Sequence, residues 1–125
     1  MTALSHMATI HPYTADKFML IDSSSRRNLE LVETLREKQK LGSLLWVLDK
    51  TKTAMGARTL RGYVEQPLID AEEINLRLGA VEELTQKPML RDEIREYLNP
   101  IYDLERLISR ISYQSANPRD MVAFA

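Results

Sequence analysis

Prolines divide the second half of the chain into short segments. They stand at positions 67, 88, 100 and 118. A proline inside a helix removes a hydrogen bond and clashes with the preceding turn, and it disfavours the helical conformation for the residue before it. A long uninterrupted helix is therefore excluded here, and the fold must be assembled from short helices that depend on packing for their stability.

Apolar residues recur at helical intervals between these prolines. The clearest signal starts at Asp70, which is followed three residues later by Glu73, the spacing of a capping box. The stripe behind this cap consists of Ile74, Leu78, Val81 and Leu84. Lys87-Pro88 ends the helix, and 89–98 predicts a further short helix that ends at Asn99-Pro100.

A denser apolar stripe follows Pro100. Asn117-Pro118 then has the pattern of a cap with proline at the first helical position, and Asp120 adds a favourable charge in that first turn. We expect the dense stripe to pack against the earlier one and Leu107 to lie in the core. The expected contact joins Leu104, Leu107, Ile108 and Ile111 to Ile74, Leu78 and Val81.

Hydroxyl residues mark the helix starts in the first half. Ser43 is a candidate cap for 44–48, and Thr53 for a helix from 54 to about 66. A serine among 23–25 is expected to cap a helix that places Leu29, Val32 and Leu35 near one face. Residues 2–10 are weakly helical and 36–40 are predicted to be loop. Together these patterns predict a mainly α fold, a multi-helix bundle of short helices with one short strand near 18–22.

Size and composition restrict the class of protein. The 125 residues suffice for one domain with a modest core, and the chain has no cysteine, which excludes disulfides and thiolate metal sites. The longest apolar run, 44–48, is far too short to cross a bilayer, and the first residues lack the pattern of a secretory signal. We therefore expect a cytoplasmic protein with no membrane partner.

The charges are distributed unevenly. Residues 26–61 carry nine basic and four acidic side chains, whereas 62–125 carry seven basic and twelve acidic ones. The basic half can pair with the acidic half, which is the interpretation we favour, or it can contact a phosphate backbone. In the second case the candidate DNA-backbone contacts are Arg26, Arg27, Lys50, Lys52, Arg58 and Arg61.

The sequence contains no recognisable motif for catalysis, metal binding or cofactor binding. The lysines before Thr51 and Thr53 lack the glycines of a phosphate-binding loop, and His6 and His11 are five residues apart, so they do not share a helical face. Adjacent acidic residues on helices point about 100° apart and cannot form a catalytic dyad.

We expect Trp46 and Tyr63 in the core. Arg77, Arg106 and Arg110 are expected to form structural ion pairs. The prediction is a non-enzymatic segment with no catalytic, cofactor or metal residues.

Three groups of residues, in this order and spacing, resemble the core or lever domain of the bacterial MutS family of DNA mismatch-repair proteins. The resemblance covers nearly the whole chain. The first group is 18–22 with 25–31; the second is 42–49, 51–61 and 65–69; the third is Ile74, Arg77, Leu78, Ala80 and Val81 with 103–107, Arg110 and 118–120.

The resemblance implies a helical region between a connector domain, whose junction would be 1–22, and long lever helices that carry a DNA clamp. Residues 23–125 would then be a partial core/lever domain, with the lever helix starting after Pro118. The lack of a glycine cap before Ala125 also indicates a helix that continues in a longer protein. The family's mismatch-reading motif and its Walker ATPase motif do not occur in this chain, so those residues cannot be carried over.

Two functions follow as expectations. The first is a structural and signal-transmitting segment that couples ATPase state to DNA clamping in the intact protein. The resemblance implies that this protein uses ATP and magnesium, binds mismatched double-stranded DNA and a MutL-like partner, and forms a homodimer. The alternative is an autonomous DNA-binding helical module that uses the basic 26–61 region.

Overall fold

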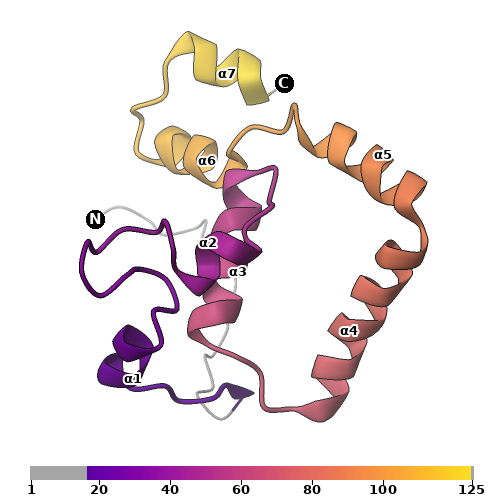
Figure 1. Ribbon diagram of the computed structural model, residues 1–125. Helices are drawn as coiled ribbons and strands as arrows, with labels where there is room; N and C mark the ends of the chain where they lie inside the picture. Colours follow the sequence, from indigo (N-terminus) through magenta and orange to yellow (C-terminus); the bar gives the residue numbers. More distant parts are fainter. Residues whose placement is uncertain (1–16, 125) are drawn as a thin grey trace.

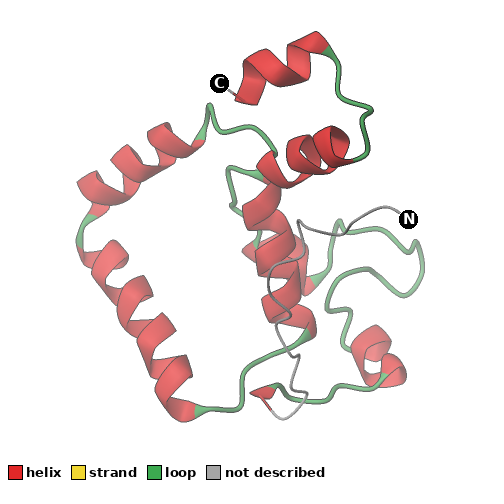
Figure 2. Ribbon diagram, turned by 180° about the vertical axis from the view of Figure 1, so that it is seen from behind, coloured by secondary structure: helices red, strands yellow, loops and turns green. Residues whose placement is uncertain are grey.

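The computed structural model describes residues 17–124, which fold mainly into short helices joined by loops (Figures 1 and 2). The helices are α1 (Ser23–Asn28), α2 (Leu44–Leu48), α3 (Ala54–Glu65), α4 (Ala71–Gln86), α5 (Pro88–Leu98), α6 (Leu104–Ser112) and α7 (Pro118–Phe124). The predicted mainly α class is confirmed. The weak helix predicted at 2–10 lies outside the described residues.

The strand predicted near 18–22 is reduced to one antiparallel bridge between Phe18 and Leu68. Met19 N donates to Pro67 O at 2.8 Å, and Ile69 N donates to Lys17 O at 3.3 Å. Leu68 is buried, whereas Leu20 is largely exposed. The prediction of a short strand was wrong because an apolar run becomes a strand only where a neighbouring segment offers several paired backbone groups.

Helix α1 is shorter than the sequence pattern predicted. Its cap is Asp22, whose Oδ1 accepts from Ser25 N at 2.9 Å, rather than a serine. The helix ends at Asn28, and Glu30 has φ of 48°, a left-handed conformation that no helix can continue through. The predicted helical face of Leu29, Val32 and Leu35 is therefore wrong.

The loop that replaces this predicted helix is held by main-chain bonds to α2. Leu44 N donates to Glu30 O at 3.0 Å, and Leu45 N donates to Leu31 O at 2.9 Å. Leu31 and Leu45 are both buried. The spacing of apolar residues along the chain does not reveal hydrogen bonds between two segments. For this reason it predicted a helix where the structure has a loop. The loop predicted at 36–40 is confirmed.

The predicted caps of the later helices are confirmed. Ser43 Oγ accepts from Trp46 N at 3.2 Å, and Thr53 Oγ1 accepts from Gly56 N at 3.0 Å. Asp70 Oδ1 accepts from Glu73 N at 2.9 Å. Each bond satisfies a backbone N–H that has no partner within the first turn of its helix. Short local patterns were therefore reliable where a polar side chain precedes an apolar helix.

The helices are arranged around α3, with α1 near its C-terminal end and α6 near its N-terminal end (Figure 1). Helices α4 and α5 form an arm that leaves the end of α3 and returns to α6, and both views show α4 well separated from α6 (Figures 1 and 2). The predicted packing of the α6 stripe against the α4 stripe is therefore wrong.

The burial of single residues shows which part of that prediction holds. Leu107 is 7% exposed, as predicted for a core residue, whereas Val81 on α4 is 61% exposed. The connection at 66–70 leads α4 away from α3 and α6, and α5 then returns toward α6 (Figures 1 and 2). Apolar periodicity identifies the inner face of a helix but not the element that covers it.

Candidate functional site

The basic and acidic halves of the chain meet where α3 contacts the start of α6. Arg58 Nη1 and Nη2 donate to the two carboxylate oxygens of Asp103 at 2.9 and 2.7 Å. Arg58 Nε also donates to Glu105 Oε2 at 2.9 Å. A fork of this geometry fixes both the distance and the orientation of the two groups. The favoured interpretation, pairing between the halves, holds at this position.

Asp103 has a second task, because it is the N-cap of α6. Its Oδ1 accepts from Arg106 N at 3.4 Å, and its Oδ2 lies 3.3 Å from Arg106 Nε. The hydrogen bonds from Arg58 lower the pKa of the Asp103 carboxyl to about 2. The same contacts raise the pKa of Arg58, so the pair stays ionised near neutral pH.

The start of α7 repeats this arrangement. Asn117 Oδ1 accepts from Asp120 N at 2.9 Å, while Asp120 Oδ2 accepts from Asn117 N at 3.0 Å. The other carboxylate oxygen, Oδ1, accepts from Arg110 Nη1 of α6 at 2.8 Å. Asp120 is only 9% exposed. The predicted cap at Asn117-Pro118 is confirmed, and Asp120 both completes that cap and joins α7 to α6.

A cavity of about 520 Å³ lies between α6, α7 and the first residue of α3. Asp103, Arg110 and Asp120 line it, and so does the buried Leu107. The two ion pairs therefore flank one shared space. Their arrangement can fix the relative directions of three helices. Arg106 and Arg119 also line the cavity, so its lining holds three arginines against two aspartates and is net positive.

The other arginines predicted to form ion pairs differ from one another. Arg106 pairs with Asp103, and Arg110 pairs with Asp120, as predicted. Arg77 instead lies over the ring of Tyr63, 3.8 Å from its centroid, in a cation–π contact between α4 and α3. Tyr63 and Trp46 are both about half exposed, so the prediction that they lie in the core was wrong.

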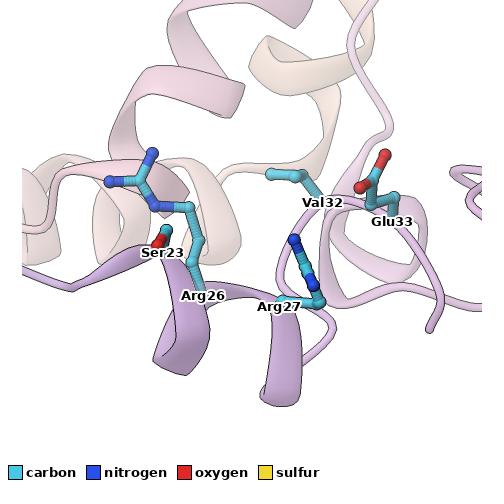
Figure 3. A pocket seen from close by; sticks show the side chains of 5 residues that line it. All are labelled: Ser23, Arg26, Arg27, Val32 and Glu33. Atoms are coloured by element: carbon cyan, nitrogen blue, oxygen red, sulfur yellow. The ribbon is translucent and has the colours of Figure 1, made fainter.

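Arg26 and Arg27 line a pocket of about 240 Å³ beside α1, together with Ser23, Val32 and Glu33 (Figure 3). Glu33 lies across the pocket from Arg26 in this view. Arg26 Nη2 donates to Ile21 O at 3.2 Å, so part of its guanidinium holds the local backbone. The carboxylate opposes the charge of the two arginines, which weakens the pocket as a site for a phosphate.

The remaining candidate DNA contacts lie elsewhere. Arg61 pairs with Glu65 on the same helix at 3.1 Å, and Arg58 is engaged by α6 as described above. Lys50 and Lys52 lie in the connection between α2 and α3, at the end of α3 opposite to α1 (Figure 1). The structure does not bring the six cations together on one surface. Contact of any of them with DNA stays a prediction.

Lys40 and Asp49 form a further ion pair inside the basic half. The hydrogen bond from Lys40, with those from Thr51, lowers the pKa of Asp49 to about 2. Asp49 also ends α2, so this pair ties the loop before α2 to the connection after it.

Within residues 17–124, no group of three or more histidine or acidic side chains is placed to hold a metal ion. None of the helices in this same part of the chain is both long and apolar enough to cross a membrane. His6 and His11 lie outside the described residues.

Sequence reasoning missed the acidic partners of the basic half. It named Asp103 and Glu105 only as charged residues beside the dense apolar stripe and within the family resemblance, and not as partners of Arg58. It assigned Asp120 only to the helix dipole and did not identify its partner Arg110, which lies in the acidic half. The opposite net charges of the two halves were the one signal that pointed to such pairs. That signal cannot name partners 45 residues apart, because the fold decides which helices meet.

The geometry describes a helical scaffold, and the comparison with known proteins assigns it to a family. The profile of MutS domain III matches residues 24–125. The chain belongs to the MutS family. It is similar to the DNA mismatch repair protein MutS of Lachnoclostridium phytofermentans, with 68% identity over 123 residues. The corresponding proteins of Ruminiclostridium cellulolyticum and Clostridium perfringens are 56% and 54% identical to it.

These similarities extend over nearly the whole of this chain but over a small part of each relative. They cover 98%, 96% and 97% of this chain, and 13%, 14% and 13% of the three MutS proteins respectively. Residues 24–125 therefore correspond to MutS domain III, and the chain spans only about one-seventh of the length of the MutS proteins that it matches.

Proposed function

We propose that this segment is a structural and signal-transmitting part of a MutS-like mismatch-repair protein, in which it couples the state of the ATPase to clamping on DNA. Membership of the MutS family supports the setting. In this proposal the intact protein binds ATP with magnesium, recognises mismatched double-stranded DNA, and works in the cytoplasm as a homodimer with a MutL-like partner. The segment itself is not an enzyme.

The observation that carries the proposal is the forked contact between Arg58 of α3 and Asp103 of α6. It joins helices from opposite halves of the chain by two hydrogen bonds of defined direction. A displacement of α3 would therefore be passed to α6 rather than absorbed by a loose apolar contact. Transmission requires an element with two arrangements whose equilibrium both ends can bias, and this joint is the candidate.

The test uses the full-length protein with Asp103→Asn. Asparagine keeps the capping oxygen but removes the charge that pairs with Arg58. We expect unchanged ATP hydrolysis without DNA and unchanged affinity for mismatched duplex, but an altered rate of ATP-induced release from that duplex. Glu96→Gln removes an exposed acidic side chain from α5 and serves as the control.

Two results would contradict the proposal. The first is a release rate equal to that of the parent protein in Asp103→Asn. The second is loss of ATP hydrolysis without DNA in this variant, because the segment would then contribute to catalysis itself.

A further inference from the structure

Two acidic residues in this structure perform the same pair of tasks. Asp103 caps α6 through Arg106 N and binds Arg58 of α3. Asp120 completes the cap of α7 through Asn117 N and binds Arg110 of α6. In each case one carboxylate accepts a backbone N–H at the start of its own helix and forms an ion pair with another helix.

The apolar contacts around these helices are sparse. Leu107 is the buried apolar residue of α6, while Leu104, Ile108 and Ile111 on the same helix remain substantially exposed. One buried leucine can hold a helix near its neighbour, but it leaves rotation about the contact weakly restrained. A hydrogen bond between charged groups has a preferred direction, so it can supply the missing restraint.

We propose that Asp103 and Asp120 are two ionic joints in series, and that together they set the direction of α7 relative to α3. This proposal rests on the proposed transmission role and deepens it, because it names the contacts that would pass a change in α3 to α7. The series runs from Arg58 to Asp103, along α6 to Arg110, and then to Asp120. Each joint is partly shielded, since the side chains of Asp103 and Asp120 are 18% and 11% exposed.

The two tasks of each carboxylate can be separated by substitution. Asp120→Asn keeps an oxygen able to accept from Asn117 N but loses the charge facing Arg110. Asp120→Ala loses both tasks. Arg110→Gln breaks the ion pair from the other side and leaves the cap intact, whereas Arg110→Lys restores the positive charge without the planar fork.

The measurement is the distance distribution between spin labels on α3 and α7, placed at Thr59 and Val122, which are both exposed. It is made on the full-length protein without nucleotide, in a background free of other reactive cysteines. We expect one narrow distribution for the parent. Asp120→Asn and Arg110→Gln should broaden or shift it, and Arg110→Lys should recover much of the parent distribution.

Two outcomes would contradict the proposal that the ion pair between Arg110 and Asp120 orients α7. A parent-like distribution in both Asp120→Asn and Arg110→Gln would show that the ion pair does not orient α7. Broadening confined to Asp120→Ala would show that the cap alone does so. Unchanged helical circular dichroism in the two charge-removing variants separates loss of orientation from loss of folding. Because no nucleotide is present, the result is independent of whether the segment couples ATP hydrolysis to DNA.

Discussion

Arg58 and Asp103 are 45 residues apart in the sequence, yet both oxygens of the Asp103 carboxylate accept hydrogen bonds from the Arg58 guanidinium. This contact joins the basic half of the chain to the acidic half, and it coincides with the cap of α6. The uneven distribution of charge along the chain thus provides an ion pair between two helices at this position. This ion pair explains the role of Arg58 without a contact to nucleic acid.

The first prediction is energetic coupling between Arg58 and Asp103. Arg58→Gln and Asp103→Asn should each lower the thermal stability of the 125-residue chain. The double variant should lose less than the sum of the single losses, because the pair is already broken in each. Thermal unfolding followed by circular dichroism measures all four proteins. Strictly additive losses would show that the contact contributes nothing.

The second prediction concerns acid. Asp103 and Asp49 have pKa values lowered to about 2 in the folded chain, from an ordinary value of 3.8. A lowered folded-state pKa stabilises the fold above the unfolded pKa, and this contribution is lost as the pH falls from about 4 toward 2. Melting temperatures measured across that range should fall less steeply in Asp103→Asn than in the parent. Glu96→Gln should keep the parent slope, and equal slopes in all three proteins would refute the assignment.

The third prediction concerns the core. Leu107→Ala should destabilise the chain by roughly 2–5 kcal/mol, the usual range for truncating a buried leucine. Leu76→Ala is the matched control, because Leu76 is 78% exposed. Denaturant unfolding measures both variants. A loss in Leu107→Ala no larger than in the control would remove Leu107 from the core.

The fourth prediction concerns Ser43, which is 1% exposed. Its hydroxyl donates to Lys40 O at 2.7 Å and caps α2 through Trp46 N. Ser43→Ala leaves both backbone groups without this partner and should cost about 1 kcal/mol of stability, as for other N-caps. The exposed Ser24 on α1 offers a control in Ser24→Ala. Similar unfolding midpoints for the two variants would contradict the role of the Ser43 cap.

The fifth prediction separates the scaffold from the alternative DNA-binding module. Titration of labelled duplex with the 125-residue chain should show no saturable binding at physiological salt, because the six candidate cations are dispersed and two are paired. Binding with a steep dependence on salt concentration would favour the alternative. In that event two double variants would be compared, Lys50→Gln with Lys52→Gln and Arg26→Gln with Arg27→Gln. The double variant that loses more affinity would identify the surface that contacts DNA.

Local features of this fold could be read from the sequence, and long-range ones could not. Ser43, Thr53, Asp70 and Asn117 were identified as caps because a cap depends on residues within one turn. The partner of the α4 stripe was misidentified, since periodicity contains no information about which helix lies opposite. The family resemblance added the setting of the segment but not the contacts inside it.

The candidate site was predictable to a smaller extent. The pairing of Arg106 and Arg110 with acidic residues was expected from their surroundings, whereas the contact of Arg77 with Tyr63 was not. Tyr63 and Arg77 lie on different helices, so their contact depends on how α3 and α4 pack. Asp103 and Asp120 were hidden for the same reason, because their second partners lie on other helices.

The main-chain bonds from Leu44 and Leu45 to Glu30 and Leu31 have a consequence for how this protein can change over time. Every residue has a backbone carbonyl and every residue except proline has a backbone N–H, so this attachment survives most replacements of the side chains around it. The outer surface of that loop is therefore free to diverge among descendants while its path stays the same. The ionic contacts of α6 and α7 are more restricted, since a replacement that removes the charge of either partner abolishes the ion pair.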